Sequence, residues 1–337
     1  MRDVPITIFA GFNMKEMVYI LTEGVLYRKK STLFFQNFEG KRVFPINSIS
    51  EIICCSRVTI KSGCLSYLMK KRIPIHFFNM YGWYLGSLYP REFLISGRVI
   101  VRQAEHYLND EKRLRIAKEI VRGTKHNILK TLEYYKNRGR DIDTEIIEEI
   151  DIDSCINIPE LMSFEGRIWS LYYKLFDKIL RKFKLRRRER RPPTNEINSL
   201  ISFGNCMLYT KCLTEIYNTY LNPAISFLHE PSDRRFSLAL DIAEIFKPLF
   251  VSRTIFSLIN KRKIDESCFD RVNRGVLLND KGKRIFIENF DKKLNTTIFY
   301  PQLRRRVSYS EVIRLECYKL MRHVLGDKEY KSFKMWW

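Results

Sequence analysis

The sequence predicts an α+β protein with a small N-terminal, mostly β domain followed by a larger all-α domain. Between residues 17 and 90, short β-branched and aromatic segments alternate with turn signals such as Glu23-Gly24 and Glu39-Gly40. From about residue 99 onward, apolar residues instead recur at helical spacing. The change of period near residue 95 places the domain boundary, so we expect domains at 1–95 and 96–337.

The first domain is expected to hold short strands interrupted by one helix. The helix covers roughly Ser62 to Lys71, where Leu65, Leu68 and Met69 share a face. A hairpin-like segment at 81–90 closes the domain. The predicted strands are Met17–Leu21, Val25–Arg28, Thr32–Phe35, Val43–Ile46, Glu51–Cys54 and Ile75–Phe78.

The second domain is expected to be nearly all helical. Helical spacing covers residues 99–138, and the acidic run from Asp141 to Asp153 then breaks it. A long helix is predicted from near Pro159, through Glu165, to about Phe183. Further helices are predicted at 195–220, 235–260 and 308–324.

The net charge and the cysteine pattern indicate which binding partners and which cellular compartment to expect. Lys and Arg total 60 against 38 acidic residues, a net charge of +22 that favours a polyanionic partner such as DNA. No apolar run approaches the length of a membrane span, so a membrane is not expected as partner. The eight cysteines form no C-x-x-C pair, which predicts buried thiols in a reducing cytoplasm. No G-x-x-x-x-G-K-[ST] loop occurs, which argues against a P-loop ATPase.

Two acids, Asp241 and Glu244, stand inside an otherwise apolar helical segment. On a helical wheel both flank the apolar stripe on one side, and their spacing puts two negative charges side by side. That arrangement is unfavourable without a cation. Half-exposed acids with Arg234, Arg235 or Lys247 as counterions remain the alternative, and the wheel alone does not exclude it.

His229 and Glu165 are the other candidate site residues. His229 follows an apolar run and precedes Pro231 and Ser232 in a turn-like segment, where a structural role is the alternative. Glu165 precedes Gly166 inside the predicted long helix. Because glycine costs about 1 kcal/mol in a helix relative to Ala, we expect Gly166 to allow close approach by another helix or by a ligand.

Two basic clusters are candidates for phosphate contacts. The first, from Arg181 to Arg191, contains eight cationic residues and one acid. The second consists of Arg304, Arg305 and Arg306. A solvated loop is an equally acceptable interpretation of either.

Taken in order, these segments resemble the CRISPR-associated spacer-integration family. The resemblance covers about Met17 to Ile264 and depends on an ordered set of motifs. They are FPINSISEI (44–52), IPIHFFNMYGWYLGSL (73–88), the Gln103 neighbourhood, LMSFEGRIW (161–169), RRPPTNEINSLISFGNCMLY (190–209) and NPAISFLHEPSDRRFSLALDIAEIFKPLF (222–250).

The resemblance implies an enzyme that inserts captured DNA fragments into a repeat array by attack of a 3′-hydroxyl on a phosphodiester. It assigns Glu165, His229 and Glu244 as ligands of one Mg²⁺ or Mn²⁺ ion, with Asp241 as the neighbouring acid and Lys247 as a nearby cation. It also implies a homodimer joined through the β domains, and a small ferredoxin-like partner protein that helps to hold double-stranded DNA. A nuclease acting on branched DNA without integration, and a non-catalytic DNA-binding scaffold, remain the alternatives.

Overall fold

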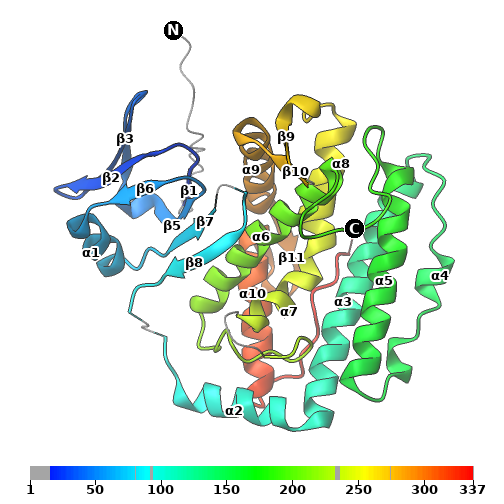
Figure 1. Ribbon diagram of the computed structural model, residues 1–337. Coiled ribbons are helices and arrows are strands. Elements are labelled where there is room, and N and C mark those ends of the chain that lie inside the picture. Colours follow the sequence, from blue (N-terminus) through cyan, green and yellow to red (C-terminus); the bar gives the residue numbers. More distant parts are fainter. Residues whose placement is uncertain (1–15, 80, 92–93, 232–235, 274, 337) are drawn as a thin grey trace. The chain divides into compact units, whose positions relative to one another are not determined.

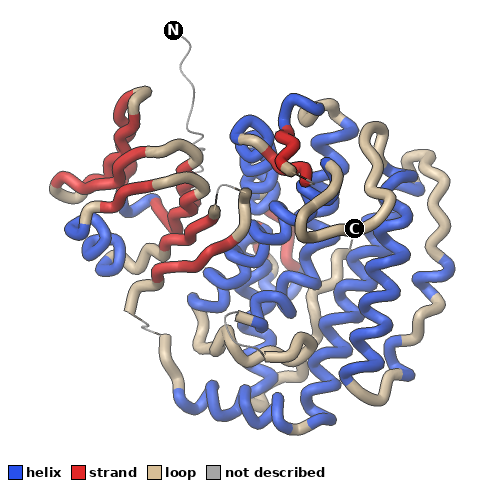
Figure 2. The backbone as a smooth tube through the Cα atoms, viewed as in Figure 1, coloured by secondary structure: helices blue, strands red, loops and turns tan. Residues whose placement is uncertain are grey.

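The computed structural model describes residues 16–79, 81–91, 94–231, 236–273 and 275–336. The chain divides into two compact units, Met1–Phe93 and Leu94–Trp337. Strands gather in the first unit and helices dominate the second (Figure 2). The predicted fold class, a β-rich region followed by a mostly helical one, is therefore confirmed.

The described residues of the first unit form two four-stranded sheets and one α-helix, α1 (Ser62–Lys70) (Figure 1). In one sheet the strand order is β1-β5-β7-β8, with β5 parallel to β1 and β7 and with β8 antiparallel to β7. In the other the order is β4-β3-β2-β6. The strands are β1 (Glu16–Ile20), β2 (Gly24–Lys29), β3 (Thr32–Asn37), β4 (Gly40–Pro45), β5 (Ile49–Cys54), β6 (Val58–Ile60), β7 (Ile75–Phe78) and β8 (Tyr84–Leu88).

One apolar core joins both sheets and α1. Leu33 and Phe35 alternate with more exposed residues along β3, so one face of that strand is buried. Leu26, Ile52 and Leu68 bring β2, β5 and α1 into the same core. The predicted strands are all present, and the segment 81–90 supplies a single strand, β8, that pairs with β7 instead of forming a hairpin by itself.

The second unit is built around α6 (Glu196–Tyr217), a helix buried on most of its circumference. It contacts α7 (Ser237–Lys247) and α10 (Tyr309–Val324), and α7 in turn packs on α3 (Asp110–Lys136). The long helix α5 (Ile158–Ile179) packs on the other side of α3 (Figure 1). The remaining helices are α2 (Gly97–Leu108), α4 (Glu145–Glu148), α8 (Arg253–Asn260) and α9 (Asp280–Asn295).

The second unit differs from the predicted all-α domain by two short pairs of β-strands. One antiparallel pair joins β9 (Phe269–Val272) to β10 (Gly275–Leu278), and a second joins β11 (Thr297–Tyr300) to β12 (Arg305–Ser308). The helix expected from 235 to 260 is interrupted by a π-helical turn, Pro248–Ser252, between α7 and α8. Proline has no backbone N–H to donate, and such π turns often stand at functional sites.

The described residues include no helix long and apolar enough to cross a membrane. All eight cysteines lie in the described part of the chain, and none forms a disulfide. Seven of them are buried, as predicted from their apolar surroundings.

Candidate active site

Glu165 sits on the inner side of α5. Asn157 caps this helix by accepting a hydrogen bond from the Glu160 N–H. Because residues four apart share a helix face, Glu165 lies between the buried residues Leu161 and Trp169. Its carboxylate is therefore partly withdrawn from water, although α5 belongs to the surface of the unit.

Asp241 fixes the loop that carries His229. Its Oδ2 accepts hydrogen bonds from the N–H groups of Phe227 (2.7 Å) and Leu228 (3.0 Å). Its Oδ1 accepts from the backbone N–H of His229 at 3.0 Å and lies 2.8 Å from His229 Nδ1. Four hydrogen-bonding contacts thus engage both oxygens of a fully buried carboxylate. These contacts hold the loop and the imidazole of His229 in place.

Two further side chains anchor the same loop. Gln103 on α2 donates from Nε2 to the carbonyls of Asn222 and Ile225 and accepts from the Asn222 N–H. Arg113 on α3 donates from Nε to the carbonyl of Phe227 at 2.9 Å. Sequence reasoning missed the role of Arg113, because nothing in its local pattern reveals a partner more than a hundred residues away.

His229 is held with its second ring nitrogen toward Glu244. The Asp241 contact assigns the proton to Nδ1, so a neutral ring presents the Nε2 lone pair. Nε2 lies 4.0 Å from Glu244 Oε1. Burial disfavours the imidazolium, but the Asp241 hydrogen bond and the charges of Asp241 and Glu244 outweigh burial and raise the pKa of His229.

Glu244 has one oxygen paired and one unpaired. Oε1 forms an ion pair with Lys247, whose ammonium also lies 5.6 Å from the centre of the Trp169 ring. Oε2 is buried and has no hydrogen-bond partner among the residues that the structure describes. The alternative of two half-exposed acids is wrong, because Asp241 is 0% and Glu244 3% exposed. Of the suggested counterions, Lys247 pairs with Glu244, whereas Arg234 and Arg235, like Ser232, lie outside the described residues.

Burial and the neighbouring charges shift the pKa of Glu165. Burial, followed by the negative charge of Glu244, raises the pKa of Glu165 to about 7. Lys247, His229 and Arg190 act in the opposite direction. Glu165 is therefore near both other candidate ligands, without a hydrogen bond or ion pair to either among the interactions of the described residues.

The donor set fits a divalent cation, although the ligands are not yet in coordinating positions. Within the described residues, no three His, Cys, Asp or Glu side chains already form a metal-binding group. Glu244 nevertheless presents a buried oxygen, Oε2, that has no hydrogen-bond partner among the described residues, and His229 presents a nitrogen lone pair 4.0 Å from the other oxygen of that carboxylate, Oε1. A cation would also relieve the repulsion between Glu165 and Glu244 that raises the Glu165 pKa.

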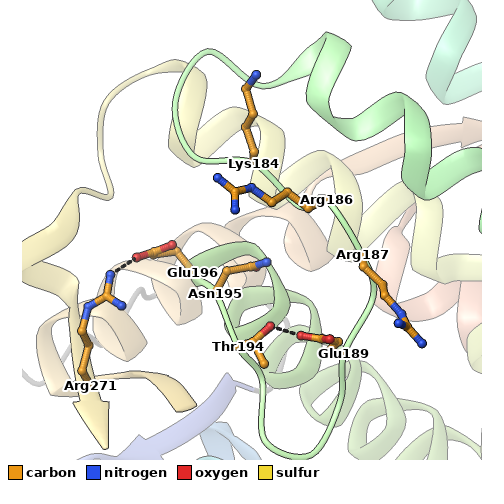
Figure 3. Close-up of a pocket in the computed structure, with 8 residues that line it drawn as sticks. All are labelled: Lys184, Arg186, Arg187, Glu189, Thr194, Asn195, Glu196 and Arg271. Carbon is orange, nitrogen blue, oxygen red and sulfur yellow. Dashed lines mark hydrogen bonds and ion pairs between the residues drawn. The ribbon is translucent and has the colours of Figure 1, made fainter. Parts of the chain in front are cut away.

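The basic run Arg181–Arg191 is divided between two environments. Arg188 ties it to α6 by donating to Asn198 Oδ1 (2.9 Å) and Ser202 Oγ (3.0 Å). Arg190 lies close enough to the site for its charge to act on Glu165. Several neighbours instead line a cavity of about 610 Å³ (Figure 3), where Arg271 pairs with Glu196. Of the second cluster, Arg305 is paired with Glu311.

The model of the family "CRISPR associated protein Cas1" matches residues 18–292 of this chain. The chain belongs to the Cas1 family. A Cas1 protein from Methanobrevibacter ruminantium is 51% identical over 326 residues, which cover 96% of this chain and 99% of the relative. A protein from Fusobacterium nucleatum named CRISPR-associated endonuclease Cas1 is 44% identical over 333 residues, covering 97% of this chain and 98% of the relative.

Solved structures agree with this membership. A Cas1 protein from Thermotoga maritima superposes with a TM-score of 0.85 at 41% identity, covering 94% of this chain and 99% of that one. A casposase bound to integration product shares the fold, with a TM-score of 0.86 at 22% identity and coverage of 95% and 93%. The resemblance noted from the motifs is thus confirmed at the level of the family.

Proposed function

We propose that this Cas1-family protein is a divalent-metal-dependent DNA integrase and endonuclease of CRISPR adaptation. The 3′-hydroxyl of a captured fragment attacks a phosphodiester at the edge of a repeat, and the 3′-oxygen of the cut strand leaves. One phosphodiester forms as another breaks, so the step needs no ATP. The observation that carries the proposal is the carboxylate of Glu244. Its buried Oε2 has no hydrogen-bond partner among the described residues, and its Oε1 lies 4.0 Å from His229 Nε2.

Each residue of the site has a distinct role in this proposal. Glu165, His229 Nε2 and Glu244 hold the metal, and Asp241 keeps the imidazole oriented through Nδ1. Bound Mg²⁺ or Mn²⁺ supplies polarisation of the scissile phosphate and stabilises charge on the attacking and leaving oxygens. A mixed imidazole and carboxylate set suits Mn²⁺ as well as Mg²⁺. Lys247 balances the charge of Glu244 and, in this proposal, also offsets that of the bound phosphate.

Double-stranded DNA is the proposed substrate. The net charge of +22 favours a polyanion. Arg190 brings one exposed cation of the basic run close to Glu165. Contacts to phosphates do not depend on base sequence, as capture of varied fragments requires.

The proposed assembly is a homodimer joined through the β-rich unit, together with a small ferredoxin-like adaptation partner. Exposed apolar side chains on that unit support an interface there, since Phe38 is 90% and Leu85 67% exposed. A chain of the Cas6-RT-Cas1–Cas2 complex shares the fold, with a TM-score of 0.82 at 16% identity over 98% of this chain.

The decisive experiment is a strand-joining assay with the full chain, its partner and Mn²⁺ or Mg²⁺. We expect joined products from the wild type, none after chelation by EDTA, and a loss of at least about 10³-fold for Glu165→Ala and His229→Ala. Glu111→Gln removes a negative charge from an exposed position on α3 and is the control. Thermal unfolding of each variant checks that the fold is kept.

The alternatives predict different products. Joining that survives both substitutions in folded protein would refute the catalytic assignment. Cleaved but never joined products from the wild type would favour a nuclease acting on branched DNA. DNA binding with neither product would favour a non-catalytic scaffold.

A further inference from the structure

A second cavity in the helical unit, of about 480 Å³, is lined by eight Lys and Arg residues and by no Asp or Glu. Its lining residues come mainly from the C-terminal end of α3 and from α8 and α9, which pack against each other. These helices are labelled in Figure 1. Arg181, from the segment after α5, adds to its wall. Glu165, His229 and Glu244 do not line it, so it is distinct from the candidate active site.

Two of the half-buried cations of this cavity, Arg253 and Lys293, come from α8 and α9. Burial, followed by the positive charge of Arg253, lowers the pKa of Lys293 to about 8. Neither residue has an ion-pair partner among the described residues. Two like charges thus share a partly dehydrated space that holds no compensating acid, and an anion would stabilise both.

Aromatic rings hold these cations in place. The guanidinium groups of Arg138 and Arg253 lie 3.6 and 4.6 Å from the centre of the Tyr134 ring, and the Lys293 ammonium lies 4.9 Å from that of Tyr309. A ring face attracts a cation much less than a phosphate does. The rings therefore orient donors without satisfying them, and Tyr134, already covered by cations, is poorly available for stacking on a base.

We propose that this cavity binds the phosphate backbone of DNA at a contact separate from the active site and independent of base sequence. Its cations come from four segments of the chain and extend from the half-buried floor to exposed Lys261 and Lys292 at the rim, which suits several successive phosphates rather than one. The helical run that carries Glu244 continues through the π turn into α8. Arg253 therefore follows Lys247 by roughly 9 Å along the axis, at ~1.5 Å per residue, which places the cavity within reach of DNA at the active site.

The test is DNA binding by the full chain in EDTA over a series of NaCl concentrations, read by fluorescence anisotropy of a labelled duplex. For the double variant Arg253→Gln with Lys293→Gln, we expect roughly tenfold weaker binding. The slope of log K against log salt should fall by about two, since each lost phosphate contact removes ~0.9. The control pair, Arg102→Gln with Arg115→Gln, removes the same charge from arginines that already pair with acids, and it should change neither value.

A second double variant controls for the possibility that the first one fails to fold. Lys261→Gln with Lys292→Gln changes only exposed side chains, and it should lower the slope in the same way without altering the melting temperature. Unchanged affinity and slope in folded cavity variants would overturn the proposal, and so would an equal loss in the control pair.

Inorganic tripolyphosphate separates DNA from a small ligand. If tripolyphosphate binding depends on Arg253 and Lys293 while DNA binding does not, the cavity takes a free polyphosphate and the DNA proposal is wrong. Because no metal or strand joining enters these measurements, failure here is distinguishable from failure of the catalytic assignment.

Discussion

The Nδ1 atom of His229 lies 2.8 Å from Oδ1 of Asp241, and the same carboxylate accepts three backbone N–H groups from the loop that carries the histidine. One buried acid therefore sets both the path of the loop and the orientation of the ring. Asp241 and Glu244, three residues apart on α7, therefore differ in their hydrogen bonding. Both oxygens of Asp241 are engaged, whereas Oε2 of Glu244 has no partner among the described residues.

Asp241→Asn should destabilise the protein, because an amide nitrogen would replace one acceptor and face backbone donors. We expect a cost of about 2–3 kcal/mol, which is a fall of roughly 4–12 °C in melting temperature for a unit of this size. His229→Gln leaves the three backbone contacts intact and should melt close to the wild type while losing strand joining. Thermal unfolding of the two variants makes the comparison. Equal melting temperatures for Asp241→Asn and the wild type would contradict the anchoring role.

The raised pKa of Glu165 predicts a stability that falls as pH increases. Below its ordinary value near 4.5 the group is protonated in both states. Between about 4.5 and 7 only the unfolded chain ionises it, so folding stability declines and is lowest above 7. In EDTA, Glu165→Gln should therefore melt above the wild type at pH 8, and the gap should narrow toward pH 5. A gain of about 1 kcal/mol corresponds to roughly 2–4 °C. A gap that widens toward pH 5 would refute this electrostatic description.

Metal binding should be visible without any chemistry. Mn²⁺ or Mg²⁺ should raise the melting temperature of the wild type, because a ligand that binds only the folded state stabilises it. Lys247→Met removes the cation that pairs with Glu244, leaving a buried carboxylate uncompensated. This variant should be less stable in EDTA by about 2–4 kcal/mol and should gain more from added metal than the wild type gains. Differential scanning fluorimetry with and without metal measures both shifts. If the double variant Glu165→Gln with Glu244→Gln showed the same rise in melting temperature on adding metal, the metal would bind elsewhere.

Two helical glycines should respond oppositely to alanine. At Gly166 a Cβ would meet no atom of the described residues within 4 Å, so none of the described helices approaches there. Gly166→Ala should stabilise α5 by up to about 1 kcal/mol, and it should reduce strand joining if DNA contacts this face. At Gly204 a Cβ would lie 2.6 Å from Val251 Cγ1 and 2.7 Å from Phe286 Cζ, so Gly204→Ala should cost about 1–3 kcal/mol. Chemical denaturation of both variants tests the contrast, and destabilisation by Gly166→Ala would show that the space is not free.

Much of the fold could be predicted because periodicity is a local property. The alternation along β3 and the helical spacing through α3 and α5 depend only on which face is buried. The helix α9 was missed although its signal was present: Asn279 caps it, and Phe286, Phe290 and Leu294 share one buried face. Dense surrounding charge concealed that spacing. The pairs β9–β10 and β11–β12 have only four residues in each strand, too few for a clear alternation.

The site was less accessible to sequence reasoning. The wheel placed Asp241 and Glu244 beside the apolar stripe, but burial depends on what packs over the helix. Both α3 and α6 pack on α7, and the loop at Phe227 donates to Asp241. The separate roles of the two acids depend on backbone N–H groups 12 to 14 residues away. No motif encodes such contacts.

The π turn at Pro248–Ser252 determines how the side chains of α8 are oriented about the helix axis. A single extra residue in a helix rotates the downstream side chains by ~100°. Downstream of the turn, the ring centres of Phe256 and of Phe176 on α5 are 4.6 Å apart. The guanidinium of Arg253 lies over the ring of Tyr134, near the end of α3. Deleting one residue from the turn would swing both side chains away from these partners while leaving Glu244 and Lys247 untouched. The turn thus acts as a spacer that lets one helical run serve two differently oriented surfaces.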